Sequence, residues 1–444
     1  MKMTRRCFLS SVGAGCLTGQ NVGQKPNIVV ILADDLGYGD LGCYGNKQNR
    51  TPQIDRMAKE GVRFTDFHSN GPMCTPTRAA LLTGMYQQRF GRAFESALGG
   101  AAGSDGGLPL SAVTISERLR EAGYVSGMFG KWHLGYAPPL VPTGQGFDEF
   151  RGLTSGDGDH HTQIDRAGGK DWWRGNAIEM EKGYTAELLT RHSIDFIERH
   201  AKRPFFLYVP HLAIHFPWQG PGDPPHRLEG TVYTDDKWGV IPNRSNVAPH
   251  VKAMVESLDG SVGRILGALR RLKLERDTLV VFTSDNGGYI NYAGGFENIS
   301  SNGPLRGQKT EMFEGGHRVP AIMRWPGRIK PSVSNETAMT FDLTRTVLTL
   351  AGVSGERLDG ADLGPVLFEG KRLPERRLFW RMRENKAARS GPWKLVWLRG
   401  QEPMLFDLDR DVGEKVDLAS RRPEVVKELM GELAAWEKDV DSGT

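Results

Sequence analysis

Carboxylates follow two short, strongly apolar segments of the sequence. Asp34 and Asp35 come directly after an aliphatic run, and Asp285 and Asn286 follow a second apolar run far along the chain. These side chains offer only hard oxygen ligands, which suit Ca²⁺ or Mg²⁺ far better than Zn²⁺. Buried without a cation, adjacent carboxylates repel one another and one of them keeps its proton. Either segment alone is typical of a helix cap or a turn, but together they predict a divalent metal site.

A cysteine stands at the start of a predicted short helix. Residues 74–78 read CTPTR and precede an Ala/Leu-rich segment that ends at Gly84. Cys74 is therefore expected at or just before a helix N-terminus, where free N–H groups and the helix dipole favour an anion. Arg78, one turn further along, adds a fixed positive charge. An isolated cysteine is more often an inert buried side chain; beside a carboxylate metal site, this one is predicted to take part in chemistry.

Two further polar clusters follow apolar runs. Lys131 and His133 come after one run, and His211 and His215 come after another. Ligands of open α/β sheets bind at the carboxyl ends of the strands. We therefore expect all four polar clusters to converge on one crevice.

The elements that must position these clusters alternate along the chain. Strands are predicted near residues 28–32, 62–67, 124–129, 205–209 and 279–282, and helices near 52–60, 115–122, 185–200 and 250–272. Because the strands are continuously apolar, they are expected to be buried on both faces. The predicted fold class is α/β, a large and mostly parallel sheet sandwiched by helices.

The pattern changes after residue 370. Strand-like runs near 378–382, 393–398 and 404–408 are separated by turns and followed by an amphipathic helix over 423–440. This pattern predicts a smaller C-terminal α+β domain with an antiparallel sheet. The predicted domains are thus 25–370 and 371–444.

The N-terminus has the features of an export signal. Basic residues precede an apolar run from Phe8 to Leu17, about half of the roughly 20 residues that a membrane span requires. A signal peptide is predicted over residues 1–24, and no stable transmembrane span. Residues 4–9, TRRCFL, resemble a twin-arginine signal; an ordinary secretory signal with two chance arginines is the alternative. The mature protein is expected in the periplasm or outside a bacterial cell, and lipidation at Cys16 stays open.

Composition limits the classes of partner. The 444 residues are 39% hydrophobic and 25% charged, which are globular proportions. Lys and Arg number 57 against 53 Asp and Glu, and three of these basic residues lie in the first 24 positions. Without that stretch the chain is nearly neutral. It has no global positive field to hold a polyanion, so no nucleic-acid partner is expected and an anionic substrate must be bound by local groups.

Five segments in order resemble a known family. From about Pro26 onward the chain is similar to the formylglycine-dependent (type I) sulfatases, arylsulfatase-like members of the alkaline-phosphatase superfamily. The matching segments are residues 26–40, 74–84, 130–135, 283–288 and 305–316, with further similarity at 391–395 and 405–408. The resemblance implies an alkaline-phosphatase-like fold and hydrolysis of a sulfuric ester.

The resemblance also implies a chemistry for the site. A formylglycine-generating enzyme would convert Cys74 to formylglycine, whose hydrate supplies the nucleophile. The implied metal ligands are Asp34, Asp35, Asp285, Asn286 and an oxygen of modified Cys74, with Ca²⁺ as the ion and Mg²⁺ as the alternative. Arg78 would steady that oxygen and the metal ligands, while Lys131 and Lys309 would hold the sulfate oxygens. His133 would hydrogen-bond the diol and help to deprotonate it on collapse, and His215 would protonate or stabilise the leaving alcohol.

Some positions leave alternatives open. His215 fits the family pattern before x-Pro, and His211 is the alternative. Thr77 replaces the usual Ser and His317 a usually aliphatic residue; for His317, approach to the substrate and burial with a backbone partner are both considered. The segment 152–183, predicted as a long surface loop, is expected near the site. For five residues of this segment, contact with the substrate and packing of the loop itself are both considered: Asp159, His160, His161, Trp172 and Trp173.

These observations favour a sulfatase acting on a sulfated small molecule or glycan. Aromatic faces beside polar groups suit sugar rings, so a sulfated carbohydrate is the expected substrate. A phosphoester or phosphonate monoester hydrolase of the same superfamily is one alternative. The other is a non-catalytic protein that binds anionic glycans and keeps Cys74 as a thiol.

Overall fold

The computed structural model describes residues 25–233, 246–292, 295–355 and 357–442. The predicted signal peptide, with Cys16, lies outside the described residues. Among the helices of these ranges, none combines the length and the apolar character needed to cross a membrane.

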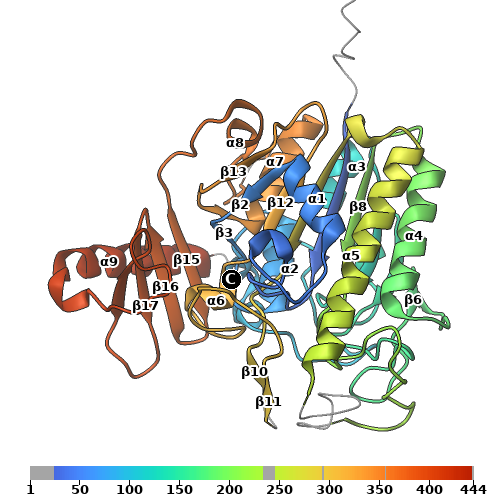
Figure 1. Ribbon diagram of the computed structural model, residues 1–444, viewed down its shortest axis with the longest axis horizontal. Helices are drawn as coiled ribbons and strands as arrows, with labels where there is room; N and C mark the ends of the chain where they lie inside the picture. Colours follow the sequence, from blue (N-terminus) through green and yellow to red (C-terminus); the bar gives the residue numbers. More distant parts are fainter. Residues whose placement is uncertain (1–24, 234–245, 293–294, 356, 443–444) are drawn as a thin grey trace, which may run out of the picture.

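A ten-stranded sheet forms the centre of the molecule (Figure 1). From one edge to the other its strands are β13 (Ser332–Ser334), β2 (Val62–Phe64), β12 (Ala321–Arg324), β9 (Thr278–Ser284), β1 (Asn27–Ala33), β8 (Phe205–Pro210), β4 (Val125–Lys131), β5 (Glu149–Leu153), β6 (Trp173–Arg174) and β7 (Ala177–Ile178). The strands from β9 to β5 run parallel, and the antiparallel pairs flank them. The predicted large, mostly parallel sheet is confirmed.

Helices cover both faces of this sheet. On one face lie α1 (Pro52–Glu60), α4 (Thr185–His200) and α5 (Ala248–Arg271); on the other lie α2 (Cys74–Thr83), α3 (Ile115–Glu121), α7 (Thr340–Ala351) and α8 (Gly364–Glu369). Figure 1 shows α4 and α5 side by side. Side chains of β1 alternate between the two cores, with Val29 and Ile31 in the first and Ile28 and Val30 in the second. The unbroken aliphatic run therefore does mark a strand buried on both faces.

A smaller lobe follows α8, at the left of Figure 1. It contains an antiparallel sheet of β15 (Arg377–Met382), β16 (Asn385–Ser390), β17 (Trp393–Trp397) and β18 (Met404–Asp407), covered by α9 (Pro423–Asp441). The sequence patterns had indicated three of these strands. They missed β16, whose polar composition hides a strand paired on both sides. The predicted domain boundary at 370/371 lies between α8 and β15.

The lobe does not stand apart from the large sheet. Trp380 and Phe406 of the lobe belong to one apolar cluster with Ala80 of α2, Phe313 and Phe341. A continuous core of this kind holds two layers in a defined relative position. The lobe thereby packs against the helix that begins at Cys74.

The remaining short strands and one short helix lie outside the two larger sheets. They are β3 (Phe67–His68) paired with β14 (Ala338–Met339), β10 (Asn291–Tyr292) paired with β11 (Phe296–Glu297), and α6 (Glu314–His317). The single strand predicted over 62–67 is thus wrong, because the chain leaves the central sheet after Phe64 and β3 joins a separate pair.

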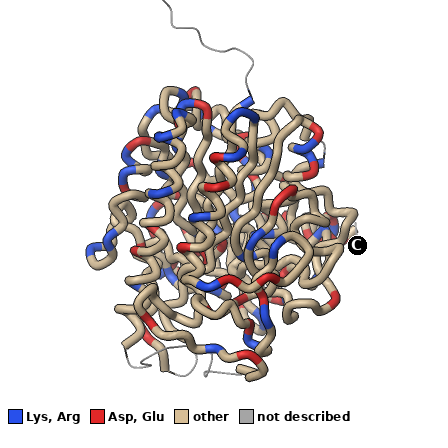
Figure 2. Tube along the Cα trace, turned by 90° about the vertical axis from the view of Figure 1, so that its right-hand side faces the viewer, with Lys and Arg blue, Asp and Glu red and all other residues tan. Residues whose placement is uncertain are grey.

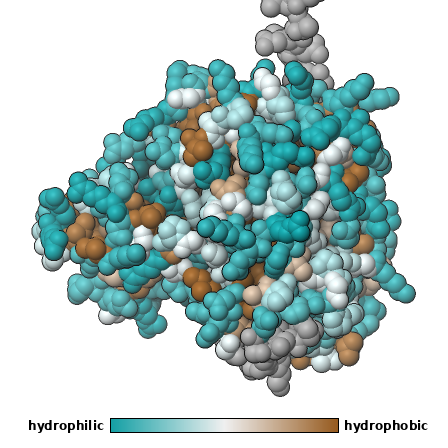
Figure 3. Space-filling view, viewed as in Figure 1, coloured by the Kyte–Doolittle hydropathy of each residue, from teal (hydrophilic) through white to brown (hydrophobic). Residues whose placement is uncertain are grey.

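The outer surface is mixed in charge. In Figure 2, Lys and Arg are interspersed with Asp and Glu on the face shown. The face in Figure 3 is mainly hydrophilic, with small hydrophobic groups scattered across it.

Candidate functional site

Four neighbouring parallel strands end at one edge of the central sheet. β9, β1, β8 and β4 lie in that order and are followed by the predicted polar clusters. Lys131 Nζ lies 2.6 Å from Asp34 Oδ2, and the backbone N–H of Asp35 donates to Asp285 Oδ1 at 3.2 Å. The predicted convergence of the strand ends is confirmed.

The four predicted metal ligands form one buried group of oxygens. Asn286 Nδ2 donates to Asp35 Oδ1 at 2.9 Å. Within the described part of the chain, the buried Oδ1 atoms of Asp34 and Asn286 accept no hydrogen bond. Burial, reinforced by the nearby Asp285 carboxylate, raises the pKa of Asp34 well above its usual range. Arg78 Nη2 lies 3.7 Å from Asp34 Oδ1, too far for a hydrogen bond. Hard oxygens without hydrogen bonds among crowded carboxylates fit a divalent cation, which would satisfy the oxygens and keep Asp34 ionised.

Arg78 connects the helix of Cys74 to this group. It lies in the second turn of α2, fully buried, and donates from Nε and Nη2 to Asp285 Oδ2 at 3.0 and 2.7 Å. Its Nη1 donates to the backbone oxygen of Lys131 at 2.6 Å. Burial acts to raise the pKa of Asp285, but the Arg78 guanidinium holds it below its usual value. Arg78 therefore orients one carboxylate of the group and keeps it charged.

Cys74 is the first residue of α2, as its sequence context predicts. Its Sγ lies 3.1 Å from His133 Nδ1, and His133 Nε2 lies 3.0 Å from the backbone oxygen of Leu98. Since that oxygen can only accept, Nε2 carries the proton and Nδ1 is the acceptor that faces the thiol. Burial and the charge of Lys131 lower the pKa of His133 well below its usual range, which keeps this ring neutral.

Thr77 keeps the function of a hydroxyl at its position. Its Oγ1 donates to the backbone oxygen of Gly71 at 3.3 Å, and the residue is fully buried. The departure from Ser therefore adds a methyl group without removing the hydrogen bond.

Lys309 comes from a distant loop that folds back over the site. Its backbone N–H donates to the Gly288 oxygen at 3.2 Å, and Thr310 N–H donates to the Pro72 oxygen at 2.8 Å. The Lys309 Nζ lies 2.6 Å from Asp35 Oδ1 and 5.1 Å from the centre of the Tyr289 ring. The loop thus brings a second ammonium group to the carboxylates.

The structure distinguishes His215 from His211. His215 Nδ1 lies 2.8 Å from the Phe216 backbone oxygen, so it donates and leaves Nε2 toward Asp35 Oδ2 at 3.7 Å. Burial, with the charges of Lys131 and Lys309, lowers its pKa well below the usual range. His211 instead contacts Ser261 Oγ of α5 at 3.0 Å and is fully buried. The geometry therefore favours His215.

A cavity of about 300 Å³ opens over Cys74. His133, His215 and Lys309 line it, as does a group of side chains that sequence reasoning missed: Asp157, Arg166, Phe216, Tyr289 and Tyr292. The carboxylate of Asp157 binds the guanidinium groups of Arg166 and Arg227 at 2.8 and 3.1 Å. The length of the 152–183 segment pointed to function, but no residue pattern singled out Asp157 or Arg166.

Of the two alternatives for Trp172 and Trp173, the structure shows packing, and contact with a sugar is wrong. Trp173 begins β6, and because side chains of neighbouring residues in extended chain point to opposite faces, the two rings pack into different cores. The predicted surface loop is in large part buried. Asp159 accepts backbone hydrogen bonds from several residues, including His161. His160 supports the site indirectly, since its Nε2 lies 3.1 Å from the His215 backbone oxygen.

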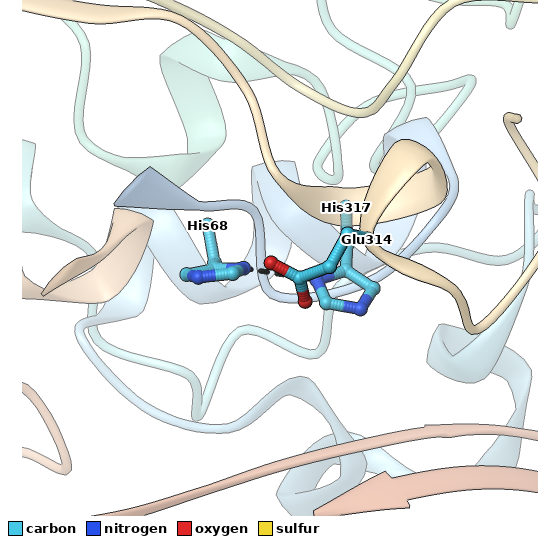
Figure 4. A group of neighbouring side chains, drawn as sticks. All are labelled: His68, Glu314 and His317. Carbon is cyan, nitrogen blue, oxygen red and sulfur yellow. Dashed lines mark hydrogen bonds between the residues drawn. The ribbon is translucent and has the colours of Figure 1, made fainter. Parts of the chain in front are cut away.

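His317 belongs to a second buried group, which we call the lobe cluster. Its members are Asp66, His68, Glu314, His317, Arg389, Lys394 and Glu414. Figure 4 shows the rings of His68 and His317 and the Glu314 carboxylate directed toward one another. The two Nδ1 atoms are 3.0 Å apart, and His317 Nε2 lies 3.2 Å from the Met312 backbone oxygen. His317 is therefore a buried histidine with a backbone partner, and it does not line the Cys74 cavity.

Comparisons with known proteins agree with this geometry. The profile of the family described as Sulfatase matches residues 26–353. Human arylsulfatase A is 35% identical over 480 residues, which cover 96% of this chain and 89% of that protein. N-acetylgalactosamine-6-sulfatase of Sus scrofa is 35% identical over 476 residues, covering 95% and 86%. The solved structure of Ps i-CgsB in complex with k-i-k-neocarrahexaose superposes with a TM-score of 0.81 at 30% identity, covering 93% of both chains. The chain belongs to the sulfatase family and is a sulfuric ester hydrolase.

Proposed function

We propose that this sulfatase releases sulfate from a sulfated carbohydrate, with formylglycine derived from Cys74 and Ca²⁺ as the bound ion. One observation carries the proposal. Cys74 begins α2 inside a cavity and faces His133, while Arg78 of the same helix holds a carboxylate of the oxygen group. Cys74 and Arg78 lie one helix turn apart, and α2 thereby connects the reactive position to the ion site.

The residues that would hold the ion are Asp34, Asp35, Asp285 and Asn286, with an oxygen of modified residue 74. This all-oxygen set favours Ca²⁺ over softer ions. When bound, a divalent cation supplies Lewis-acid polarisation of an oxygen nucleophile. The Oδ1 atoms of Asp34 and Asn286, which accept no hydrogen bond from any described residue, support this assignment.

The lysines are proposed to bind the sulfate group. Lys309 lines the cavity, and the Lys131 ammonium donates a hydrogen bond to the Asp34 carboxylate. Two ammonium groups at this place offset negative charge on the reacting group, an effect that is strong where water is excluded. Arg78, already committed to Asp285, is proposed to position the other groups and not to bind sulfate itself.

The two histidines are proposed to move protons at two different groups, His133 at residue 74 and His215 at the leaving alcohol. His133 offers Nδ1 as an acceptor beside residue 74, held in that tautomer by the Leu98 oxygen. His215 has its Nδ1–H committed to the Phe216 oxygen, so Nε2 is the atom that would serve the leaving alcohol. To donate a proton there the ring must first be charged, and the negative charge of a bound sulfate ester would offset the two lysines that disfavour the charged ring. Positioned acid–base groups of this kind contribute about 10²- to 10⁴-fold in rate.

A carbohydrate substrate is supported by the cavity and by the relatives. Phe216, Tyr289 and Tyr292 give the cavity aromatic faces next to charged groups, a combination that suits sugar rings. One relative is named for N-acetylgalactosamine 6-sulfate, and Ps i-CgsB was solved with a neocarrahexaose. Export through a twin-arginine signal to the periplasm or beyond, and maturation by a formylglycine-generating enzyme, complete the proposal.

A sulfate-release screen over defined sulfated mono- and oligosaccharides tests the substrate class. We expect turnover of at least one sulfated sugar and of an aryl sulfate, with far slower turnover of the matching aryl phosphate and phosphodiester. Faster turnover of the phosphorus esters would favour the phosphoester or phosphonate hydrolase instead.

Mass spectrometry of protein from the native host tests the nucleophile. Conversion to formylglycine lowers the mass of the Cys74 peptide by about 18 Da relative to the thiol. An unshifted peptide together with no sulfate release would support the non-catalytic glycan-binding alternative.

A further inference from the structure

A second, larger cavity lies beside the one over Cys74. It measures about 580 Å³ and shares Met73 and Ala97 with the smaller cavity as common lining. Its far side is the turn between β15 and β16 of the lobe, including Arg383, together with Arg399 after β17. A ligand that leaves the first cavity over Met73 therefore enters a space bounded by the C-terminal lobe.

Residues 95–98 form the loop between the two cavities, and this loop is held at both ends. At one end, the backbone oxygen of Leu98 contacts His133 Nε2 at 3.0 Å. At the other, the buried Glu95 carboxylate binds the Arg381 guanidinium at 2.7 Å and accepts the backbone N–H of Arg383 at 3.0 Å. The lobe turn is thereby fixed relative to the reactive centre. A binding surface built across it is preformed, which reduces the entropy lost when a ligand binds.

The lobe side of the larger cavity is basic. Arg383 and Arg399 are both exposed there, and Glu384 binds Arg399 at 2.6 Å between largely exposed side chains. Within the described residues, no carboxylate forms an ion pair with the Arg383 guanidinium. A further cavity of about 340 Å³ shares both arginines and extends to Lys386 and Trp397. Glu384 and Glu437 also line it, and Glu437 lies 2.8 Å from Lys386. Arg383 is therefore the basic side chain of this surface that forms no ion pair with a described carboxylate, and Arg399 lies beside it.

We propose that Arg383 and Arg399 form a second subsite, which binds an anionic group on the sugar next to the one that loses its sulfate. This inference rests on the proposed carbohydrate substrate. The ligand is an oligosaccharide whose neighbouring sugar carries a sulfate or a carboxylate, because guanidinium groups bind both anions in a bidentate manner. The small cavity binds the reacting sugar, and Arg383 and Arg399 of the lobe bind the next one.

The test uses three disaccharides that share the sulfated sugar identified in the release screen. Their second sugar carries a sulfate, a carboxylate, or neither. For the wild-type enzyme we expect kcat/KM about tenfold higher for at least one anionic disaccharide than for the neutral one. In the double variant Arg383→Ala/Arg399→Ala the ratio should fall to about one, mainly through KM, while aryl sulfate turnover stays within about twofold.

Arg410→Ala provides the matched control, since Arg410 is a highly exposed arginine of the same lobe outside these cavities. It should leave the ratio unchanged. No preference in the wild type, or an equal preference in the double variant, would overturn the subsite while aryl sulfate turnover keeps the proposed function intact. If no sulfate ester is turned over, the proposed function fails, and calorimetric binding of chondroitin sulfate disaccharide to the wild type and double variant decides the subsite separately. Equal affinities would reject it.

Discussion

Two buried, charged clusters can be compared: the lobe cluster, and the active-site cluster, whose members are Asp34, Asp35, Arg78, Lys131, Asp285, Asn286 and Lys309. In each region three possible metal-binding atoms lie within 4.8 Å of one another. They differ in what satisfies their oxygens. In the lobe cluster, the fully enclosed Lys394 Nζ lies 2.9 Å from both Glu314 Oε1 and Glu414 Oε1. Arg389 also binds both oxygens of Asp66. This cluster carries its own cations.

The active-site cluster is less complete. Among the described residues its Asp34 Oδ1 and Asn286 Oδ1 accept no hydrogen bond, and Arg78 Nη2 stays 3.7 Å from Asp34 Oδ1. Glu414 Oε1 of the lobe cluster also lacks a hydrogen bond, but the Lys394 ammonium lies only 2.9 Å from it. Lys309 also lines the cavity, whereas Lys394 is fully buried. Proximity of ligand atoms alone thus does not distinguish a metal site from a structural ion network. What distinguishes them is how closely the protein's own charged groups approach the buried oxygens that lack hydrogen bonds.

The largest effect is expected from removing the nucleophile. Cys74→Ala should lower aryl sulfate turnover by at least about 10⁴-fold, while thermal unfolding changes little because the thiol makes a single weak contact with His133. Cys43→Ala, at the chain's other described free cysteine, should keep normal rates. Near-normal turnover by the Cys74 variant would refute the assigned nucleophile.

Ion removal separates the two clusters directly. Chelation should lower turnover about 10³-fold, since Lewis-acid stabilisation contributes several kcal/mol, and added Ca²⁺ should restore it. Elemental analysis should give one ion per chain, lost in Asp285→Asn and retained in Glu314→Gln. An ion lost from the Glu314 variant would place metal in the lobe cluster and contradict the distinction.

Breaking the lobe cluster should affect stability instead of rate. Lys394→Met leaves the buried carboxylates of Glu314 and Glu414 without their ammonium partner, which should cost about 3–5 kcal/mol in the free energy of unfolding. Turnover at 25 °C should stay within about twofold. Denaturant unfolding measures the loss, and Lys371→Met, at a largely exposed lysine, should leave the free energy of unfolding unchanged within experimental error. Equal stability of the two variants would mean that Lys394 contributes little.

The smallest of the four effects concerns the leaving group. His215→Gln should lower kcat about 10²-fold, and more for alkyl sulfates than for aryl sulfates, because an alcohol needs protonation more than a phenol does. His211→Gln is the matched control on the same segment and should change kcat less than threefold. Steady-state kinetics with both ester types checks the pair, and equal losses for the two variants would reopen the assignment.

Half of the ten-stranded sheet could be predicted, because the signals of β1, β2, β4, β8 and β9 are local; β5, β6, β7, β12 and β13 were not predicted. Aliphatic runs such as residues 28–32 mark strands buried on both faces, and the helix predicted over Thr185–His200 has those same bounds in the structure. The position of Cys74 at a helix start also depends on neighbours in sequence. Strand β16 was not predicted because its composition is polar, and only its pairing with β15 and β17 makes it a strand.

Residues of the cavity wall were harder to predict. Asp157 and Arg166 lie in a long segment without periodicity, and the two tryptophans nearby turned out to be core residues. The path of such a segment depends on contacts with remote parts of the chain, for example the hydrogen bond of His160 to the His215 backbone. No local pattern encodes that path.

By itself, the sequence determined which side chains end the strands and therefore which groups meet at the catalytic edge, because parallel strands bring their carboxyl ends together. Tertiary structure alone decided how those groups pair, which loops border the cavity and how the lobe extends it. These features depend on packing between segments hundreds of residues apart, such as Glu95 with Arg381.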